Sequence, residues 1–471
     1  MHNVILFFTF LFSILYYKLY IIFNDRKIFE YKIKQYEKKS KNIFSRCNIY
    51  DKKLLLLNYT KKKYKINKKN IKHIIEKREY LFPSCIAING IVNNESRGLS
   101  GLELYFNDIL NLKINKTYHP RLTGQERFKT YTKKYKKKKL LTTIDAIQSE
   151  KVYRLLNKYV EQYKSEYAVC IIMDGLSGEL ETITQYPQYT EENKNNIDIK
   201  FLYPLSITQS HEVGSVIKAF LMLAAFNEKI VTPETNIDCW GRKEKIIQGR
   251  ILTTWKAHGI IPFKTVIKES NNFGVAQIGL CLNEKLFDYY KKCGFGEKTG
   301  IQINGENQGI LHPINKWSKR TPLSLSFGYE MSCTLLQLVS AWSVFTNQGK
   351  RIIPKIIATQ ASKYSNIIFQ NQAIQDSLDV LYFTPDNVKK YGFKKKINGK
   401  LYGKTGTANT LINKEYNKDI NIYTFIGHLE KKNTKKIIGI SVYGSNNPKL
   451  LSSQISLPIF LEISDLISKE I

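Results

Sequence analysis

Paired cysteine motifs are absent from this sequence. Its 471 residues include seven cysteines, and no two of them form a C-x-x-C pair. A disulfide scaffold needs a high density of cysteines, and an odd number leaves at least one of them unpaired. A structural zinc site needs closely spaced ligand pairs, which this chain does not offer. We therefore predict neither a disulfide-stapled fold nor a metal site.

Acidic residues are scarce, with 40 Asp and Glu against 73 Lys and Arg, so the formal net charge is +33. Such an excess of basic residues is typical of proteins that bind nucleic acids or anionic surfaces. Here lysine, asparagine and isoleucine are abundant throughout, including the apparent loops, which indicates a general compositional bias. We predict no nucleic-acid partner. Hydrophobic residues make up 43% of the chain, which excludes a wholly disordered protein, and the length allows two or three domains.

One long hydrophobic run is present, at the start of the chain. Residues 4–23 carry a single charge, Lys18, and a helix of this length rises about 30 Å, enough to cross a bilayer with Lys18 at the interface. The run lacks the basic leader and the A-x-A cleavage site of a signal peptide. We predict a retained transmembrane anchor over residues 1–23. Lysines follow it, but long domains translocate largely regardless of charge, so they do not fix its orientation.

The rest of the chain divides at a lysine-rich run over residues 133–139. Before it, residues 24–139 contain short apolar runs broken by lysines, and we expect a small N-terminal pedestal module that contains strands. After it, Asp145 and Gln148 have capping-box spacing ahead of an apolar helical face. Strand pairs are predicted at 168–173 with 179–183 and at 420–429 with 437–443, and a helix is predicted after Pro458. This order predicts an α/β (α+β) domain over residues 140–471, with helices on a mainly antiparallel sheet.

The segment 211–226 holds the first candidate for chemistry. From Val216 to Phe226 every residue except Lys218 is apolar, so a helix here would be buried on all sides. Burial would lower the pKa of Lys218 toward the range of a general base. Ser215 lies three positions earlier on the same helix face, where such a base could activate its hydroxyl as a nucleophile. The alternative is a serine N-cap with a lysine that snorkels to solvent.

Two further segments carry candidate polar groups. Lys404-Thr405-Gly406-Thr407 is expected on an edge strand, where a cation and two hydroxyls can hold a carboxylate and a peptide can add as a further strand. In Ser270-Asn271-Asn272, Ser270 could relay a proton and Asn272 could bind a substrate amide. Neither triplet is specific alone. Other S-x-N triplets occur, and a second K-T-G at Lys298-Thr299-Gly300 is interpreted as a turn that enters a strand at 301–305.

The order S-x-x-K, S-x-N, K-T-G along the chain is the informative feature. This set, in this order, is typical of penicillin-binding proteins and serine β-lactamases, and the chain resembles a class B penicillin-binding protein, a monofunctional peptidoglycan D,D-transpeptidase. The resemblance extends over nearly the whole chain and includes the segments 97–103 (RGLSGLE), 141–145 (LTTID), 327–338 (FGYEMSCTLLQL) and 424–427 (TFIG). Segments 403–409 and 421–429 resemble the division-specific septal enzyme (FtsI type) more than the elongation enzyme.

The resemblance assigns a role to each motif residue. It implies that Ser215 is acylated, that Lys218 is its base, that Ser270 and Asn272 form the second motif, that Lys404, Thr405, Gly406 and Thr407 form the third, and that the oxyanion hole uses the N–H groups of Ser215 and Thr407. Some positions depart from the usual family pattern without removing a reacting group: Val213, Val216, Ile217, Asn271 and Leu335.

The resemblance also implies a setting. It predicts a penicillin-binding transpeptidase fold, no cofactor, and a single-pass protein of the bacterial inner membrane with its catalytic domain in the periplasm at the division septum. The implied partners are peptidoglycan stem peptides, lipid-linked precursor strands, a membrane glycosyltransferase and other division proteins, with β-lactams as inhibitors. The alternatives are an elongation-type transpeptidase, a β-lactamase or carboxypeptidase on the same fold, and a catalytically inactive scaffold that binds an anionic cell-wall polymer.

Overall fold

The computed structural model describes residues 14–15, 44–66, 72–113, 139–190, 193, 195–412 and 415–471. The chain divides into two compact units, residues 1–45 with 111–136 and residues 46–110 with 137–471. The predicted anchor over residues 1–23 lies outside the described residues, apart from Ile14 and Leu15. Within the described part, none of the helices has the length and apolar character needed to span a membrane. The predicted boundaries of the anchor and pedestal stay predictions.

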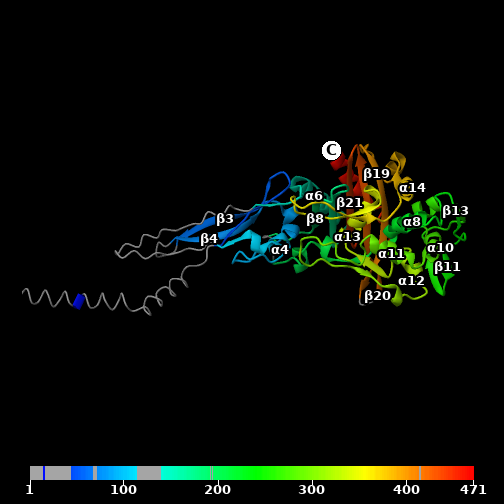
Figure 1. Ribbon diagram of the computed structural model, residues 1–471, viewed down its shortest axis with the longest axis horizontal. Coiled ribbons are helices and arrows are strands. Elements are labelled where there is room, and N and C mark those ends of the chain that lie inside the picture. Colours follow the sequence, from blue (N-terminus) through cyan, green and yellow to red (C-terminus); the bar gives the residue numbers. More distant parts are fainter. Residues whose placement is uncertain are drawn as a thin grey trace, which may run out of the picture. The chain divides into compact units, whose positions relative to one another are not determined.

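A six-stranded sheet forms the centre of the second unit, and Figure 1 labels its long strands β19, β20 and β21. Its order is β18-β19-β20-β21-β7-β8, and every neighbouring pair is antiparallel. The strands are β7 (Tyr167–Asp174), β8 (Leu180–Tyr186), β18 (Tyr382–Phe383), β19 (Lys400–Ile412), β20 (Glu415–Lys431) and β21 (Thr434–Tyr443). Both predicted hairpins are confirmed, β7 with β8 and β20 with β21.

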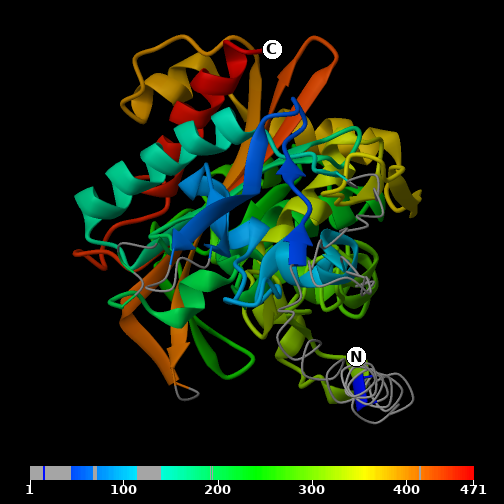
Figure 2. The ribbon, with the colours of Figure 1, turned by 90° about the vertical axis from the view of Figure 1, so that its left-hand side faces the viewer.

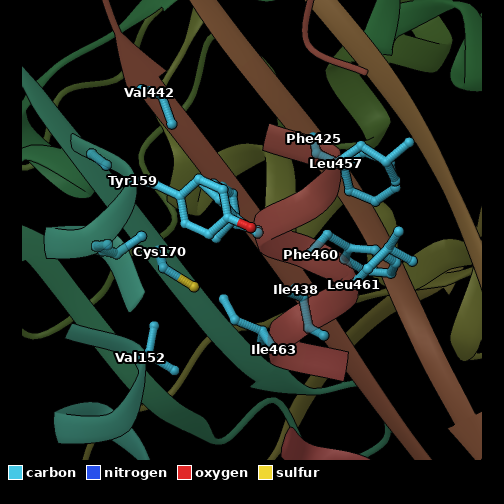
Figure 3. Packing of buried hydrophobic residues seen from close by; sticks show 14 of the residues in the cluster. Val152, Tyr159, Cys170, Phe425, Ile438, Val442, Leu457, Phe460, Leu461 and Ile463 are labelled. Carbon is cyan, nitrogen blue, oxygen red and sulfur yellow. The ribbon is translucent and has the colours of Figure 1, made fainter. Parts of the chain in front are cut away.

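The two terminal helices of the domain cover one face of this sheet. They are α6 (Ala146–Tyr163) and α16 (Ser456–Ser468), and Figure 2 shows them beside each other in teal and red. The predicted cap is confirmed, because the Asp145 side chain accepts a hydrogen bond from the Gln148 N–H at 3.0 Å. Figure 3 shows how α16 packs: Phe460 lies 4.2 Å from Phe425 of β20, measured between ring centroids. Each large apolar side chain buried in this layer contributes about 1.5–3 kcal/mol.

Two helices are almost wholly buried, α8 (Lys218–Asn227) and α13 (Leu335–Thr346). Helix α13 packs on the opposite face of the sheet, and α8 lies beside α13. Thr334 and Gln337 form a capping box at the start of α13, so Leu335 at the usual proline position leaves the helix entry intact. A Cβ at Gly439 of β21 would lie only 2.6 Å from Val339 of α13, so glycine allows the close contact. The other helices near the site are α9 (Phe263–Lys268), α10 (Asn272–Leu282), α12 (Thr321–Leu325), α14 (Asn371–Leu381) and α15 (Pro385–Lys390).

The prediction of a strand at 301–305 is wrong. Residues 301–305 form bends and turns, and the next strand is β14 (Ile310–Leu311). Glu306 explains the difference, because its carboxylate accepts hydrogen bonds from the backbone N–H groups of Thr299 at 2.7 Å and Gly300 at 3.1 Å. These bonds fold the chain back on itself at the second K-T-G. Residues 298–300 themselves have no regular structure, and Gly300 has a φ of +80° that suits glycine.

The described residues before position 111 contain a buried ionic cluster. Glu103 of α4 (Gly101–Tyr105) has a fully buried carboxylate that pairs with Arg46 and, at 2.7 Å, with Arg78 of β4 (Lys72–Tyr80). Asn58 of β3 (Leu56–Ile66) donates to the same carboxylate at 3.1 Å. Glu103 is the last residue of the motif 97–103. Its carboxylate joins this motif to Arg46, Asn58 and Arg78, which lie far from it in the sequence.

The cysteine on α10, Cys281, is exposed, and the other six are buried. Burial raises the pKa of the Cys85 and Cys293 thiols to about 12. The absence of disulfides agrees with the expectation from cysteine spacing.

Candidate active site

Ser215 lies in a tight turn at the start of α8. Residues Gly214–Ile217 form one 3-10 turn and the α-helix begins at Lys218, so the helix predicted after Gly214 opens with a tighter turn than expected. Gly214 has a φ of +55°, and a Cβ there would lie 2.9 Å from the Thr407 carbonyl oxygen. A Cβ on Gly406 would lie 2.8 Å from the Val216 nitrogen. The turn and the K-T-G strand therefore pack backbone against backbone.

Lys218 is fully buried, as the sequence predicted. Its Nζ donates hydrogen bonds to the Ser270 carbonyl oxygen at 2.8 Å and to Asn272 Oδ1 at 2.6 Å, and lies 3.1 Å from Ser270 Oγ. The Asn272 orientation is fixed because its Nδ2 donates to the Thr253 carbonyl at 2.8 Å. Two carbonyl-type acceptors use two N–H groups of a neutral amine, which leaves its lone pair for a hydroxyl proton.

Lys404 lies on the other side of Ser270. Its Nζ donates to Ser270 Oγ at 3.2 Å and to its neighbour Thr405's carbonyl at 3.2 Å, and the side chain is nearly buried. Burial lowers the pKa of Lys404 to about 8. Burial also lowers the pKa of Lys218 well below its ordinary value, and the charge of Lys404 lowers it further. The charge of Lys404 makes Lys218 give up its proton more readily, and Lys404, with a pKa of about 8, stays largely cationic near neutral pH.

The second motif is held in a strained conformation. Ser270 has a φ of +52°, in the left-handed region that serine seldom adopts. Asn271 is fully buried and caps α10, because its Oδ1 accepts from the backbone N–H groups of Phe273 and Gly274 at 2.9 and 3.1 Å. The unusual middle residue of the motif is thus the N-cap of α10, a position that favours asparagine.

The third motif lies on a free strand edge, as predicted. β18 pairs with β19 only at Leu401 and Tyr402, and no other described strand pairs with the outer edge at Lys404–Thr407. Thr405 and Thr407 alternate with Gly406 and are partly exposed. The Thr407 hydroxyl lies 2.8 Å from Ser452 Oγ, and that serine also hydrogen-bonds the Gly406 carbonyl. Ser452 fixes the end of the motif and was missed, because a lone serine in a loop carries no sequence signal.

The structure brings every predicted motif residue to one place. Ser270 hydrogen-bonds both lysines, and the Gly406–Thr407 backbone packs on the Ser215 turn. Asn272 differs from expectation, because both ends of its amide are bound within the protein rather than left for a substrate. A serine at a helix start, three positions before a buried lysine with a lowered pKa and close to a second lysine on a strand edge, is an arrangement suited to acyl transfer through a serine ester.

Known proteins resemble this chain in sequence and in fold. Residues 168–465 match the transpeptidase family described as "Penicillin binding protein transpeptidase domain". The chain is 26% identical to the peptidoglycan D,D-transpeptidase FtsI of Buchnera aphidicola subsp. Baizongia pistaciae, over 83% of this chain and 70% of that protein. It is 26% identical to the stage V sporulation protein D of Bacillus subtilis, over 79% of this chain and 60% of that protein.

A solved structure of penicillin-binding protein 3 from Mycobacterium tuberculosis, complexed with aztreonam, superposes with a TM-score of 0.74 at 20% identity. The match covers 90% of this chain and 96% of that one. The fold is that of the penicillin-binding enzymes. The chain belongs to the penicillin-binding protein transpeptidase family, and it resembles the class B, FtsI-type members.

Proposed function

We propose that this chain is a peptidoglycan D,D-transpeptidase that cross-links stem peptides during septal wall synthesis through an acyl-enzyme on Ser215. The observation that carries the proposal is the Lys218 amine, which is buried and hydrogen-bonded to the Ser270 carbonyl and to Asn272 Oδ1, neither of which is a carboxylate. A buried cation would be costly here, so the amine is neutral and able to accept a proton.

The contacts of the two lysines and Ser270 support the following reaction. Lys218 takes the proton of Ser215 as its oxygen attacks the carbonyl between the two terminal D-Ala residues of the donor. Lys404 and Thr405 hold the terminal carboxylate, and the N–H groups of Ser215 and Thr407 stabilise the oxyanion. The C–N bond breaks, and D-Ala leaves with a proton delivered from Lys218, with Ser270 between the two amines as a relay. An amine of a neighbouring stem peptide then attacks the ester and restores the Ser215 hydroxyl.

The test is covalent labelling with a fluorescent penicillin. We expect one adduct, located on Ser215 by peptide mass spectrometry and absent from the Ser215→Ala variant, which keeps its circular dichroism spectrum. A stable adduct supports the transpeptidase. Release of the adduct within seconds would favour a β-lactamase, and a folded protein without any adduct would favour an inactive scaffold.

Acylation should also fall in alkaline solution. Burial places the pKa of Lys404 at about 8, so the cation that holds the carboxylate is present below this pH and lost above it. We expect the second-order acylation rate constant to fall as the pH rises through about 8, and to be halved near that pH, because the Lys404 charge is lost. The measurement is a rate profile from pH 6 to pH 10 with a carboxylate-bearing penicillin. A constant rate from pH 7 to pH 10 would contradict the assigned role of Lys404.

The setting of the enzyme is part of the same proposal. The resemblance to FtsI-type relatives supports a membrane-anchored protein with its catalytic domain in the periplasm, which acts at the septum beside a glycosyltransferase. Truncation of residues 1–23 should release the protein from sedimented membranes, and retention of the truncated protein would argue against an N-terminal anchor.

A further inference from the structure

The segment Thr253–His258 lies against the second motif, and three of its groups contact residues 269–272. The Thr253 carbonyl accepts from Asn272 Nδ2 at 2.8 Å. The Trp255 indole N–H donates to the Glu269 carbonyl at 2.6 Å. The His258 Nδ1 atom lies 3.2 Å from Asn271 Nδ2. Because Ser270 between these positions has a strained φ of +52°, the segment supplies contacts that hold it there.

The hydrogen bonds around Asn271 determine which ring nitrogen of His258 acts as an acceptor. Asn271 Oδ1 accepts two backbone N–H groups, so this side of the amide must be the oxygen and the other side must be the NH₂ group. The NH₂ group is a donor, so His258 Nδ1 must be an acceptor without a proton. A neutral ring then carries its proton on Nε2, which lies 3.6 Å from Glu269 Oε2. Protonation of Nδ1 would set one donor against another.

We propose that His258 is a positioning residue for the acylation reaction: its unprotonated Nδ1 holds the Asn271 cap, which in turn keeps Ser270 and Asn272 on the Lys218 amine. This inference rests on the proposed function of the site. His258 touches no reacting group, and it acts through Asn271.

The position of His258 is fixed by its surroundings. Glu269 on the motif loop faces Nε2 at 3.6 Å, and Lys256 on the same segment lies 3.7 Å from Glu269. The Gly241 N–H donates to the His258 carbonyl at 2.7 Å, and the His258 side chain is only about 10% exposed.

Two variants of the full chain test the proposal. In His258→Asn the side-chain oxygen can stand near the Nδ1 position and accept from Asn271, but it does not titrate. In His258→Leu no acceptor remains. We expect His258→Asn to acylate within about 3-fold of the natural protein at pH 7.5, and His258→Leu to acylate about 10- to 100-fold more slowly, since a displacement of about 1 Å has effects of that size.

Rescue by His258→Asn separates positioning from a general loss of structure, provided that both variants keep the circular dichroism spectrum of the natural protein. A His258→Asn rate as low as that of His258→Leu, or a His258→Leu rate within 2-fold of the natural one, would overturn the proposal. Nitrogen chemical shifts of the histidine ring give a second readout without activity, and a proton on Nδ1 at pH 7.5 would overturn it as well. Failure of the natural protein to acylate would instead refute the proposed function.

Discussion

Replacing Lys218 by methionine is expected to slow acylation by a penicillin about 10²–10⁴-fold, the usual contribution of a positioned general base. Methionine has similar length and fits a buried helix, but it offers no lone pair basic enough to take the Ser215 proton. The Lys218 amine is fully buried and bonded to Ser270 and Asn272. The measurement is the second-order rate constant for the fluorescent adduct at pH 7.5.

Lys229 offers a matched control. It follows α8 directly and its side chain is exposed, so Lys229→Met removes an amine from the same segment without touching the site. We expect its rate to stay within 2-fold of the natural protein. If Lys218→Met also acylated within about 10-fold, another group would have to be the base, and Lys404 would be the first to test.

Replacing Glu103 by alanine is expected to lower the free energy of unfolding by about 3–5 kcal/mol, because it leaves two buried guanidinium groups without their carboxylate. Arg46 and Arg78 both pair with this fully buried side chain, and Asn58 donates to it. The expected result is a lower midpoint in chemical denaturation, followed by tryptophan fluorescence and circular dichroism.

Glu95 is the control for this change. It lies in the same part of the chain and is exposed, so Glu95→Ala should change stability by less than about 0.5 kcal/mol. A loss below 1 kcal/mol for Glu103→Ala would mean that water reaches the two arginines and that the cluster contributes little to folding.

Local signals in the sequence predicted the elements that position the site. Asp145 and Gln148 predicted the start of α6, and the apolar run after Val216 predicted a buried helix with one amine inside it. These predictions succeeded because capping and burial are governed by neighbours within a few residues. The edge position of Lys404 also followed from its own strand pattern.

Contacts between distant segments could not be predicted in this way. Ser452 binds the Thr407 hydroxyl from 45 residues away, and Arg46 reaches Glu103 across 57 residues. His258 precedes the second motif in an irregular segment with no periodic pattern, so its link to Asn271 appears only in three dimensions. The prediction of a strand after Lys298 was wrong because the Glu306 carboxylate binds the Thr299 N–H and turns the chain there.

The distribution of the thiols has a practical consequence. A maleimide dye should react with the natural protein at Cys281 alone, because the other six cysteines are buried. That position lies near the far end of α10, the helix that begins at Asn272. A label there needs no engineered mutation, and stopped-flow fluorescence from it would report any shift of this helix while an inhibitor acylates Ser215.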